Sequence, residues 1–539
     1  MLRSHVLSLF ASIFDAILFA GCSTSSPMLN GGPPPPGPSS TDVLTYHYDN
    51  QRTGQNLNET TLTPANVNST KVGKLGEFAA DGKVDAQPLY LSSVDTPSQG
   101  KKNVLYVATE HDSVYAFDAD GAGAGAPIWK VSLLGAGESP SDDHGCGQVT
   151  PEIGITSTPV IDRSRGAIYV IAVSKNSAGQ YFQRIHALDL TTGQELLGGP
   201  KTITATYPGM GAGSSGGSIV FNPGQYLERP GLLEVNGTIV TTWGSHCDQS
   251  PYTSWVMAFN AGTLAQSSVL NLAPNGSDGG IWMSGTAPAA DASGNIFFIL
   301  GNGTFDSTLD ANGFPVNHDC GNCFVKISSG SSMALADYFT PFNTVAESNA
   351  DTDFGSGGPL LLPDMTDSSG KTRHLAVGAG KDANIYVLDR DNMGKFSASQ
   401  NQIYQQISGQ LAGGVFSKPS YFNGTVYFAA VGDALKAFPL TSAKLATTPS
   451  SQSSHAFSYP GASPSISANG TMNGIVWAVD NGGSLHAFDA TNLANELYDS
   501  SKTGGRDSFS GNKFITPVVV NGKVYVGTPN SVAVFGLLP

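Results

Sequence analysis

At three places in this sequence of 539 residues a histidine lies within two residues of a cysteine: His144 and Cys146, His246 and Cys247, and His318 and Cys320. Imidazole and thiolate groups are ligands that zinc prefers, so a metal site is one interpretation. The spacing matches no common zinc pattern, however. The four cysteines are an even number, and the chain begins with a segment typical of export, which favours disulfides. We therefore predict disulfides among Cys146, Cys247, Cys320 and Cys323. A local Cys320–Cys323 bridge would leave Cys146 to pair with Cys247, and the other pairings stay open.

The first 22 residues are typical of a bacterial export signal. Arg3 precedes an apolar run over residues 6–20, and residues 18–22, Leu-Phe-Ala-Gly-Cys, resemble a lipoprotein cleavage box. Asp15 and Phe19 depart from that pattern, so an ordinary secretory signal is the alternative. Residues 23–44 are rich in Pro, Gly and Ser, which predicts a stiff spacer. We predict export to the periplasm or the cell surface, with a lipid anchor at Cys22.

The elements that position the remaining residues are predicted to be strands. Within residues 104–134, three strand-like segments (104–108, 113–117 and 128–134) are separated by polar or Gly-rich breaks. The ending Ala116-Phe117-Asp118 recurs, with variation, at seven further places: 187–189, 258–260, 323–327, 387–389, 437–439, 487–489 and 534–536. Eight such units predict an all-β fold, a single eight-bladed β-propeller with four-stranded antiparallel blades, over residues 45–539. The wider spacing of the first units predicts long loop insertions in the early blades.

Composition and charge exclude several classes of function. The sequence contains 65 Gly and 32 Pro, and only 13% of its residues are charged, which suits turn-rich β structure. The formal net charge of −15 gives no electrostatic support for a nucleic-acid partner. The Gly-rich runs at 213–217 and 355–358 lack the spacing of a nucleotide-binding loop, and the chain has no Cys-x-x-Cys-His motif for haem attachment.

Two segments near the start, Thr45-Tyr-His-Tyr-Asp-Asn-Gln-Arg-Thr-Gly54 and Leu62-Thr-Pro-Ala-Asn-Val67, resemble the N-terminal segment of the pyrroloquinoline quinone (PQQ) dependent dehydrogenases. The blade repeats extend this resemblance to Phe535. It implies the eight-bladed quinoprotein fold. Because the wider family contains both dehydrogenases and non-catalytic assembly or binding proteins, the resemblance indicates fold more strongly than function.

The resemblance also implies a cofactor site. Trp282 in Gly-Gly-Ile-Trp-Met resembles the aromatic floor beneath the quinone, and a blade-packing role is the alternative. Four further residues resemble the family's cofactor and metal contacts: Lys381 beside the quinone oxygens, Asp85 and Arg184 at the pocket wall, and Asn302 as a calcium ligand. For Arg184 the alternative is an ion pair on the blade surface, and for Asn302 a turn. Asp319 is the nearest equivalent of the catalytic base, which also touches the calcium.

Three positions depart from the dehydrogenase pattern. Gln180 stands where the family has a carboxylate for calcium, and a neutral amide is a poorer ligand for a hard dication. Cys146 is single where the family has two adjacent cysteines. Glu152 stands near the place of an arginine that grips a quinone carboxylate, where an acid would repel the cofactor.

Three functions are therefore open. The first is a binding or scaffold protein of the cell envelope with a degenerate cofactor pocket. The second is a PQQ- and calcium-dependent dehydrogenase that oxidises an alcohol or a sugar in the periplasm. The third is a carbohydrate-active propeller whose insertions at 137–160, 204–235 and 304–320 line a groove. The predicted partner is a small molecule, a polysaccharide or an envelope protein. We predict that the protein contacts the membrane only through the lipid anchor. We also predict that it is a monomer.

Overall fold

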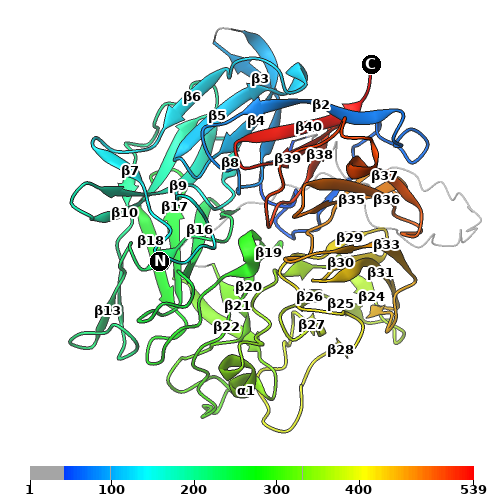
Figure 1. The fold of residues 1–539 in the computed structure, drawn as a ribbon. Coiled ribbons are helices and arrows are strands. Elements are labelled where there is room, and N and C mark those ends of the chain that lie inside the picture. The colour runs from blue at the N-terminus through cyan, green and yellow to red at the C-terminus, as the bar shows by residue number, and fades with distance from the viewer. Residues whose placement is uncertain (1–41, 98, 330–331) are drawn as a thin grey trace, which may run out of the picture. The chain divides into compact units, whose positions relative to one another are not determined.

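Eight sheets, each built on four antiparallel strands, follow one another around a common axis in the computed structural model of the protein (Figure 1). The structure describes residues 42–97, 99–329 and 332–539. The predicted export signal, the lipidation site Cys22 and most of the predicted spacer lie outside the described residues. The all-β, eight-bladed propeller predicted from the repeated strand endings is confirmed.

Each blade consists of four strands that follow one another in the sheet. Blades 1 to 4 are β3–β6 (Leu89–Thr96, Gly100–Ala108, Ser113–Asp118, Trp129–Ser132), β8–β11 (Val160–Asp162, Ala167–Asn176, Tyr181–Asp189, Lys201–Thr202), β15–β18 (Leu233–Val235, Thr238–Ser245, Trp255–Asn260, Gln266–Asn271) and β19–β22 (Ala289–Ala290, Ile296–Ile299, Phe324–Ser328, Ala334–Phe339). Blade 5 contains β23, β26, β27 and β28 (Leu360–Leu361, Leu375–Ala379, Ile385–Asp389, Gln405–Ile407), and blade 6 contains β29, β30, β31 and β33 (Ser420–Phe422, Thr425–Ala429, Asp433–Thr441, Ser451–Phe457). Blade 7 is β34–β37 (Ser465–Asn469, Met472–Asp480, Ser484–Asp489, Glu496–Asp499), and blade 8 is β38–β40 with β2 (Val518–Val520, Lys523–Gly527, Ser531–Leu537, Val72–Ala79).

Shorter elements lie beside or between the blades. They are β1 (Gln55–Asn56), β7 (Glu138–Pro140), β12 (Thr206–Pro208), β13 (Ser218–Val220), β14 (Tyr226–Leu227), β24 (Met365–Thr366), β25 (Thr372–Arg373), β32 (Lys444–Leu445), the helix α1 (Thr344–Asn349) and the 3₁₀ turns η1 (Ala119–Gly121), η2 (Met283–Gly285) and η3 (Ser500–Lys502). The strands β7, β12 and β13 belong to the insertions of the early blades. In the described part of the chain, no helix is long and apolar enough to cross a membrane.

The hydrophobic core is divided among the contacts between neighbouring blades. Each of the eight main clusters of buried apolar side chains joins two adjacent blades, and together they run once around the ring. Strand β9 shows how one strand serves two clusters: Tyr169 and Ile171 face blade 3, whereas Ile168 and Val170 face blade 1. Because successive side chains of a strand point to opposite faces, both faces are apolar and the inner strands read as continuous hydrophobic runs.

The repeated Ala-Phe-Asp ending is the end of the third strand of a blade. Its phenylalanine is buried between blades, as Phe117 and Phe488 are. Its aspartate turns the chain toward the fourth strand, because the carboxylate accepts a hydrogen bond from the backbone N–H two residues on. Asp189 accepts from Thr191 and Asp489 from Thr491, at 2.9 Å in both cases. The motif therefore combines a core residue with a turn residue at fixed spacing.

Residues 43–56 form a hub that hydrogen-bonds to every blade. The partner is the second residue of the innermost strand in all eight blades: Tyr90, Ile161, Glu234, Ala290, Leu361, Tyr421, Ile466 and Val519. Arg52 is completely buried within the hub, and its guanidinium donates to the carbonyls of Tyr46 and Pro288, both at 2.8 Å. The segment recognised by resemblance at Thr45–Gly54 thus fixes the inner strands relative to one another.

The ring is closed by strands from the two ends of the described chain. In blade 8 the outer strand β2 pairs antiparallel with β40, from Val72 opposite Leu537 to Ala79 opposite Ser531. Figure 1 shows the two strands side by side, β2 in blue and β40 in red. The eighth blade therefore exists only when both ends are in place.

Candidate ligand-binding site

A cavity lies on the propeller axis, at the ends of the innermost strands where they begin. Its lining side chains are Gln148, Arg229, Asp248, Trp282, Ser284, Asp353, Ser356, Lys381, Phe416, Tyr459, Lys513 and Phe514. Most of them precede an innermost strand by four to seven residues, as Arg229 precedes β15 and Phe514 precedes β38. Seven of the eight blades or their leading loops contribute, which makes this the place where the propeller as a whole can form a site.

The indole of Trp282 lies against backbone that only glycine allows to come so close. A Cβ atom added at Gly244, Gly280 or Gly301 would lie 2.9 Å from an atom of the indole. The two residues after it, Met283 and Ser284, adopt positive φ angles of 40° and 51°. A fixed indole that borders a cavity is suited to stacking against a flat ring, and the role of Trp282 as a floor beneath a quinone stays a prediction.

An aromatic wall accompanies Trp282. The rings of Phe416 and Tyr459 meet edge to face with centroids 5.3 Å apart, and Tyr459 meets Phe514 in the same way at 6.1 Å. Phe514 has a φ of 66°, which is strained for a bulky residue and is found most often at functional sites.

Two cations in the cavity form no direct ion pair within the described part of the chain. Arg229 is only 6% exposed, and its guanidinium stacks on the ring of Phe514 at 4.7 Å. Neither Arg229 nor Lys513 has a hydrogen bond or an ion pair with any residue in the described ranges. Burial and the neighbouring cations Lys83 and Arg229 lower the pKa of Lys513. Because a buried charge without a partner costs folding free energy, the bound anion that this part of the cavity would favour would recover some of that cost.

Lys381, in contrast, has two anionic partners. Its Nζ donates to Oδ1 of the buried Asp353 at 2.8 Å and to the carboxylate of Asp351. Burial alone would lower the pKa of Lys381, but the two carboxylates outweigh it and raise the pKa. The ammonium group therefore lies between the two carboxylates and compensates part of their charge.

The residues predicted to hold calcium do not meet. Asn302 donates from Nδ2 to Asp351 at 3.1 Å, and its side chain borders a separate surface depression with Asp278 and Thr304. Gln180 is exposed at the turn between β9 and β10, where it accepts from Asn176. Asp319 is buried and accepts from the backbone N–H groups of Asn275 and Gly276 at 2.8 and 2.9 Å. Its carboxylate holds a loop and does not border the axial cavity, so these donors do not fit a shared calcium.

The two other predicted cofactor contacts lie outside the cavity lining. Asp85 is close to it, because it accepts from Asn512, the neighbour of Lys513, at 2.7 Å. Arg184 lies in blade 2 and forms a two-pronged ion pair with Glu138, at 2.7 Å for both contacts. The Arg184 guanidinium lowers the pKa of Glu138 to about 2. Arg184 therefore matches the ion-pair alternative.

Glu152, expected to repel a quinone carboxylate, is turned away from the cavity. Its carboxylate lies 2.8 Å from Nδ1 of His111 and is not among the lining groups. The cavity is lined instead by Arg229, Lys513, Phe514, Tyr459 and Phe416, which the sequence patterns did not single out. Their common signal is position, a few residues before an innermost strand, and it becomes visible only once those very short strands are known.

The four cysteines form two disulfides, Cys146–Cys247 and Cys320–Cys323. The disulfide prediction is confirmed, and the zinc interpretation of these cysteines is excluded because every thiol of the four is oxidised. The Cys146–Cys247 bridge joins two loops at the cavity, since Gln148 and Asp248 follow its cysteines and belong to the lining. The rings of His144 and His246 stack beside it with centroids 3.9 Å apart.

Comparison with known proteins identifies the fold. No protein-family model matches the sequence, and no curated protein sequence is similar to it. The structure is similar to a quinohemoprotein alcohol dehydrogenase from Comamonas testosteroni, with a TM-score of 0.60 and 15% identity over 92% of this chain and 80% of that chain. It is also similar to the quinohemoprotein alcohol dehydrogenase ADHIIG from Pseudomonas putida HK5, with a TM-score of 0.59 and 14% identity over 92% and 80% of the two chains.

A third solved structure, a europium-containing methanol dehydrogenase, has a TM-score of 0.60 and 12% identity, over 92% of this chain and 98% of that chain. The likeness to the eight-bladed propellers of the quinoprotein dehydrogenases, inferred from the sequence, is therefore confirmed for the fold.

Proposed function

We propose that this quinoprotein-like propeller is an exported binding protein that takes a flat, anionic ring compound into its axial cavity. The observation that carries the proposal is the buried Arg229, which faces the cavity and forms no ion pair with any residue that the structure describes. Lys513 adds a second cation, near the carboxylate of Asp85 but without a direct ion pair among the described residues, and Trp282 with the aromatic wall adds surfaces on which a ring can stack. Carboxylates on a planar ring would satisfy both sets of groups at once.

PQQ is the first ligand to test, because it is planar, carries three carboxylates, and belongs to the proteins whose propellers this chain resembles. Trp282 would stack against its rings, and Arg229 and Lys513 would bind its carboxylates. Bound PQQ would supply a quinone that accepts two electrons. The residues present do not fit the calcium site of a dehydrogenase. Lys381 lies between Asp351 and Asp353, and the side chains predicted to bind calcium lie apart from one another. We therefore place binding ahead of alcohol oxidation.

A calcium-dependent dehydrogenase is the second candidate, and the position of Trp282 and Lys381 in one cavity favours it. Titration of PQQ into the purified protein in the presence of EDTA, followed by tryptophan fluorescence, tests binding alone. We expect saturable quenching that weakens at least tenfold in Trp282→Ala. The matched control is Trp129→Phe, because Trp129 lies in blade 1 and does not border the cavity.

The same samples then separate the two candidates. With PQQ, Ca²⁺, a panel of alcohols and sugars and an artificial electron acceptor, the binding proposal expects no dye reduction above the level of the free cofactor. Dye reduction that requires Ca²⁺ and is lost in Trp282→Ala would establish the dehydrogenase instead. Absence of any PQQ binding to the wild-type protein would overturn the choice of ligand.

The proposal also includes export of the protein and its attachment to the membrane by a lipid at Cys22. The two disulfides support an oxidising compartment outside the cytoplasm. When the full chain is expressed in a bacterium fed a radioactive fatty acid, we expect label in the wild-type protein and none in Cys22→Ser. Label that persists in Cys22→Ser would contradict the anchor, and secretion without label would indicate an ordinary signal peptide.

A further inference from the structure

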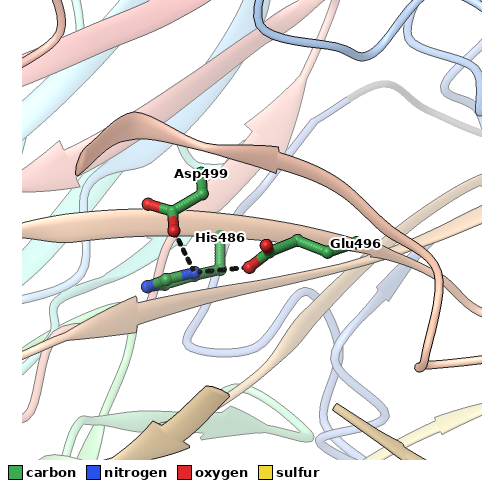
Figure 2. A group of neighbouring side chains, drawn as sticks. All are labelled: His486, Glu496 and Asp499. Atoms are coloured by element: carbon green, nitrogen blue, oxygen red, sulfur yellow. Dashed lines mark hydrogen bonds and ion pairs between the residues drawn. The ribbon is translucent and has the colours of Figure 1, made fainter. Parts of the chain in front are cut away.

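Three ionisable side chains of blade 7 converge on one point, as Figure 2 shows. Nδ1 of His486, in β36, lies 3.2 Å from Oε1 of Glu496 and 3.8 Å from Oδ2 of Asp499, both in β37. The three atoms all lie within 4.8 Å of one another. Among the residues that the structure describes, no other group of three His, Cys, Asp or Glu side chains does so. None of the three borders the axial cavity.

The imidazole of His486 is held in one orientation. Its side chain is 1% exposed, and its ring stacks on His455 with centroids 4.1 Å apart and meets Phe457 edge to face at 5.6 Å. On the far side of the ring, Nε2 lies 2.9 Å from the hydroxyl oxygen of Ser484. Nδ1 is therefore directed at the two carboxylates, and a polar partner on the other ring nitrogen helps to fix the orientation of a histidine ligand.

The spacing of the three atoms suits a small dication. Zinc bonds to imidazole nitrogen and carboxylate oxygen are about 2.0–2.2 Å long, which places ligand atoms around a tetrahedral ion about 3.4 Å apart. The two distances from His486 Nδ1, 3.2 and 3.8 Å, lie on either side of that value. One nitrogen with two carboxylates favours borderline first-row metals over calcium, which prefers six or more oxygen ligands.

We propose that His486, Glu496 and Asp499 form a binding site for a first-row transition-metal dication of the zinc type, with a fourth coordination position open to water. Lys502 now neutralises part of the charge of the two carboxylates, contacting Glu496 and lying 3.1 Å from Oδ2 of Asp499. Its side chain is 64% exposed, and exposed ion pairs contribute at most about 1 kcal/mol, so an arriving dication can displace it.

Blade 2 provides an internal comparison. His186 occupies the corresponding position of the third strand, in His-Ala-Leu-Asp against His-Ala-Phe-Asp, and its Nδ1 contacts Glu195. A histidine–glutamate pair is thus a feature of more than one blade and does not by itself make a site. Blade 7 differs because Asp499 adds a third ligand atom, so the proposal assigns metal binding to blade 7 alone.

The test is a titration of the full chain with Zn²⁺ and, for a spectroscopic signal, with Co²⁺, after treatment with EDTA. We expect one equivalent to bind with saturation, and Co²⁺ to give visible absorption bands of a low-coordinate site. Asp499→Asn removes a charged ligand while an asparagine can keep the cap that Asp499 provides to the Ser501 N–H, so the fold is retained. In Asp499→Asn and Glu496→Gln we expect at least tenfold weaker binding.

Two further variants distinguish a metal site from a structural ion-pair cluster. Lys502→Ala removes the competing ammonium group and should tighten Zn²⁺ binding several-fold, whereas a purely structural ion-pair cluster would only lose stability. Glu195→Gln, the matched change in blade 2, should leave the affinity unchanged. Absence of stoichiometric Zn²⁺ binding, or binding that Asp499→Asn and Glu496→Gln leave intact, would overturn the proposal. PQQ binding does not enter this test, because the two sites share no residue.

Discussion

A positively charged side chain has opposite roles at two positions of the cavity. Lys381 is paired with Asp353 and Asp351, so its charge belongs to the structure, whereas the buried Arg229 forms no ion pair with a described carboxylate and its charge remains for a ligand. An arginine kept in this state lowers the stability of the empty protein, because its desolvation is not offset by a partner. Stability and ligand binding should therefore respond in opposite directions to its removal.

Replacement of Arg229 by methionine tests that opposition. We expect Arg229→Met to unfold at a higher urea concentration than the wild type, with a gain of about 1 kcal/mol, and to lose most of its affinity for PQQ. Lys381→Met should instead cost about 3 kcal/mol, because it leaves the carboxylate of Asp353 buried and unpaired. Equal destabilisation by the two changes would show that Arg229 has a structural partner after all.

A second residue-scale prediction concerns Glu228, which precedes Arg229. Glu228 is 2% exposed and accepts from the hydroxyl of Thr241 at 2.6 Å, and burial raises the pKa of its carboxyl to about 8. In the unfolded chain the same group loses its proton near pH 4.5. Between these two values the folded state holds one more proton, so the free energy of unfolding falls as the pH rises.

Urea unfolding between pH 5 and pH 8 measures this effect. We expect the wild type to lose up to about 4 kcal/mol across that interval through Glu228, and Glu228→Gln to remove this part of the slope because the amide stays neutral. Glu347, whose carboxyl pKa burial raises to about 7, contributes in the same direction, and Glu347→Gln is the control for it. An unchanged slope in Glu228→Gln would mean that water reaches the carboxylate.

At the scale of elements, the inner strands are the parts that sequence patterns describe least well. The third strands carry the Ala-Phe-Asp ending and could be counted in advance, because a buried aromatic and a turn aspartate recur at fixed spacing. The innermost strands have only two or three residues in most blades, as in β15 and β38, and carry no such signal. Residues defined by these strands, such as Arg229 and Phe514, were consequently missed.

The site residues that the sequence did suggest came from a resemblance, and where the structure places them depends on the local backbone. Trp282 borders the cavity because three glycines leave room for its indole. Asp319 and Gln180 were placed by counting along insertions of variable length. Neither position could be fixed without knowing that the Asp319 carboxylate binds the 275–276 backbone and that Gln180 lies at a turn.

The two disulfides differ in the length of chain they enclose, which gives an element-scale prediction. Cys146 and Cys247 are 101 residues apart, and Cys320 and Cys323 are three apart. Loop-closure entropy predicts about 4–5 kcal/mol of stabilisation from the long loop and about 2 kcal/mol from the short one. In chemical unfolding we expect the Cys146→Ser, Cys247→Ser pair to be destabilised more than the Cys320→Ser, Cys323→Ser pair. The opposite order would show that native contacts, rather than the unfolded chain, determine the effect.

At the scale of the whole molecule, stability depends on closure of the ring rather than on any single blade. Each blade buries its two faces against two neighbours, so opening one contact exposes two apolar surfaces. The segment before residue 80 contributes twice to closure: residues 43–56 bond to all eight inner strands, and β2 completes blade 8 beside β40. Without it, β40 would become an unpaired edge strand with a row of free N–H and C=O groups, which invites association with other chains.

A shortened chain that begins at Gly82 tests this dependence. We expect it to form oligomers in size-exclusion chromatography with light scattering and to lose the near-ultraviolet circular dichroism of its buried aromatic residues. Co-expression with a separate fragment of residues 42–81 should restore a monomer, because the β2–β40 pairing and the hub contacts need no covalent link to the rest of the ring. A fragment carrying Arg52→Met should restore it less well, since Arg52 donates to Pro288 at the start of blade 4. If the shortened chain alone stays monomeric and unfolds as the full chain does, the seven complete blades and the three remaining strands of blade 8 must close by themselves, and the hub would then be dispensable for the ring.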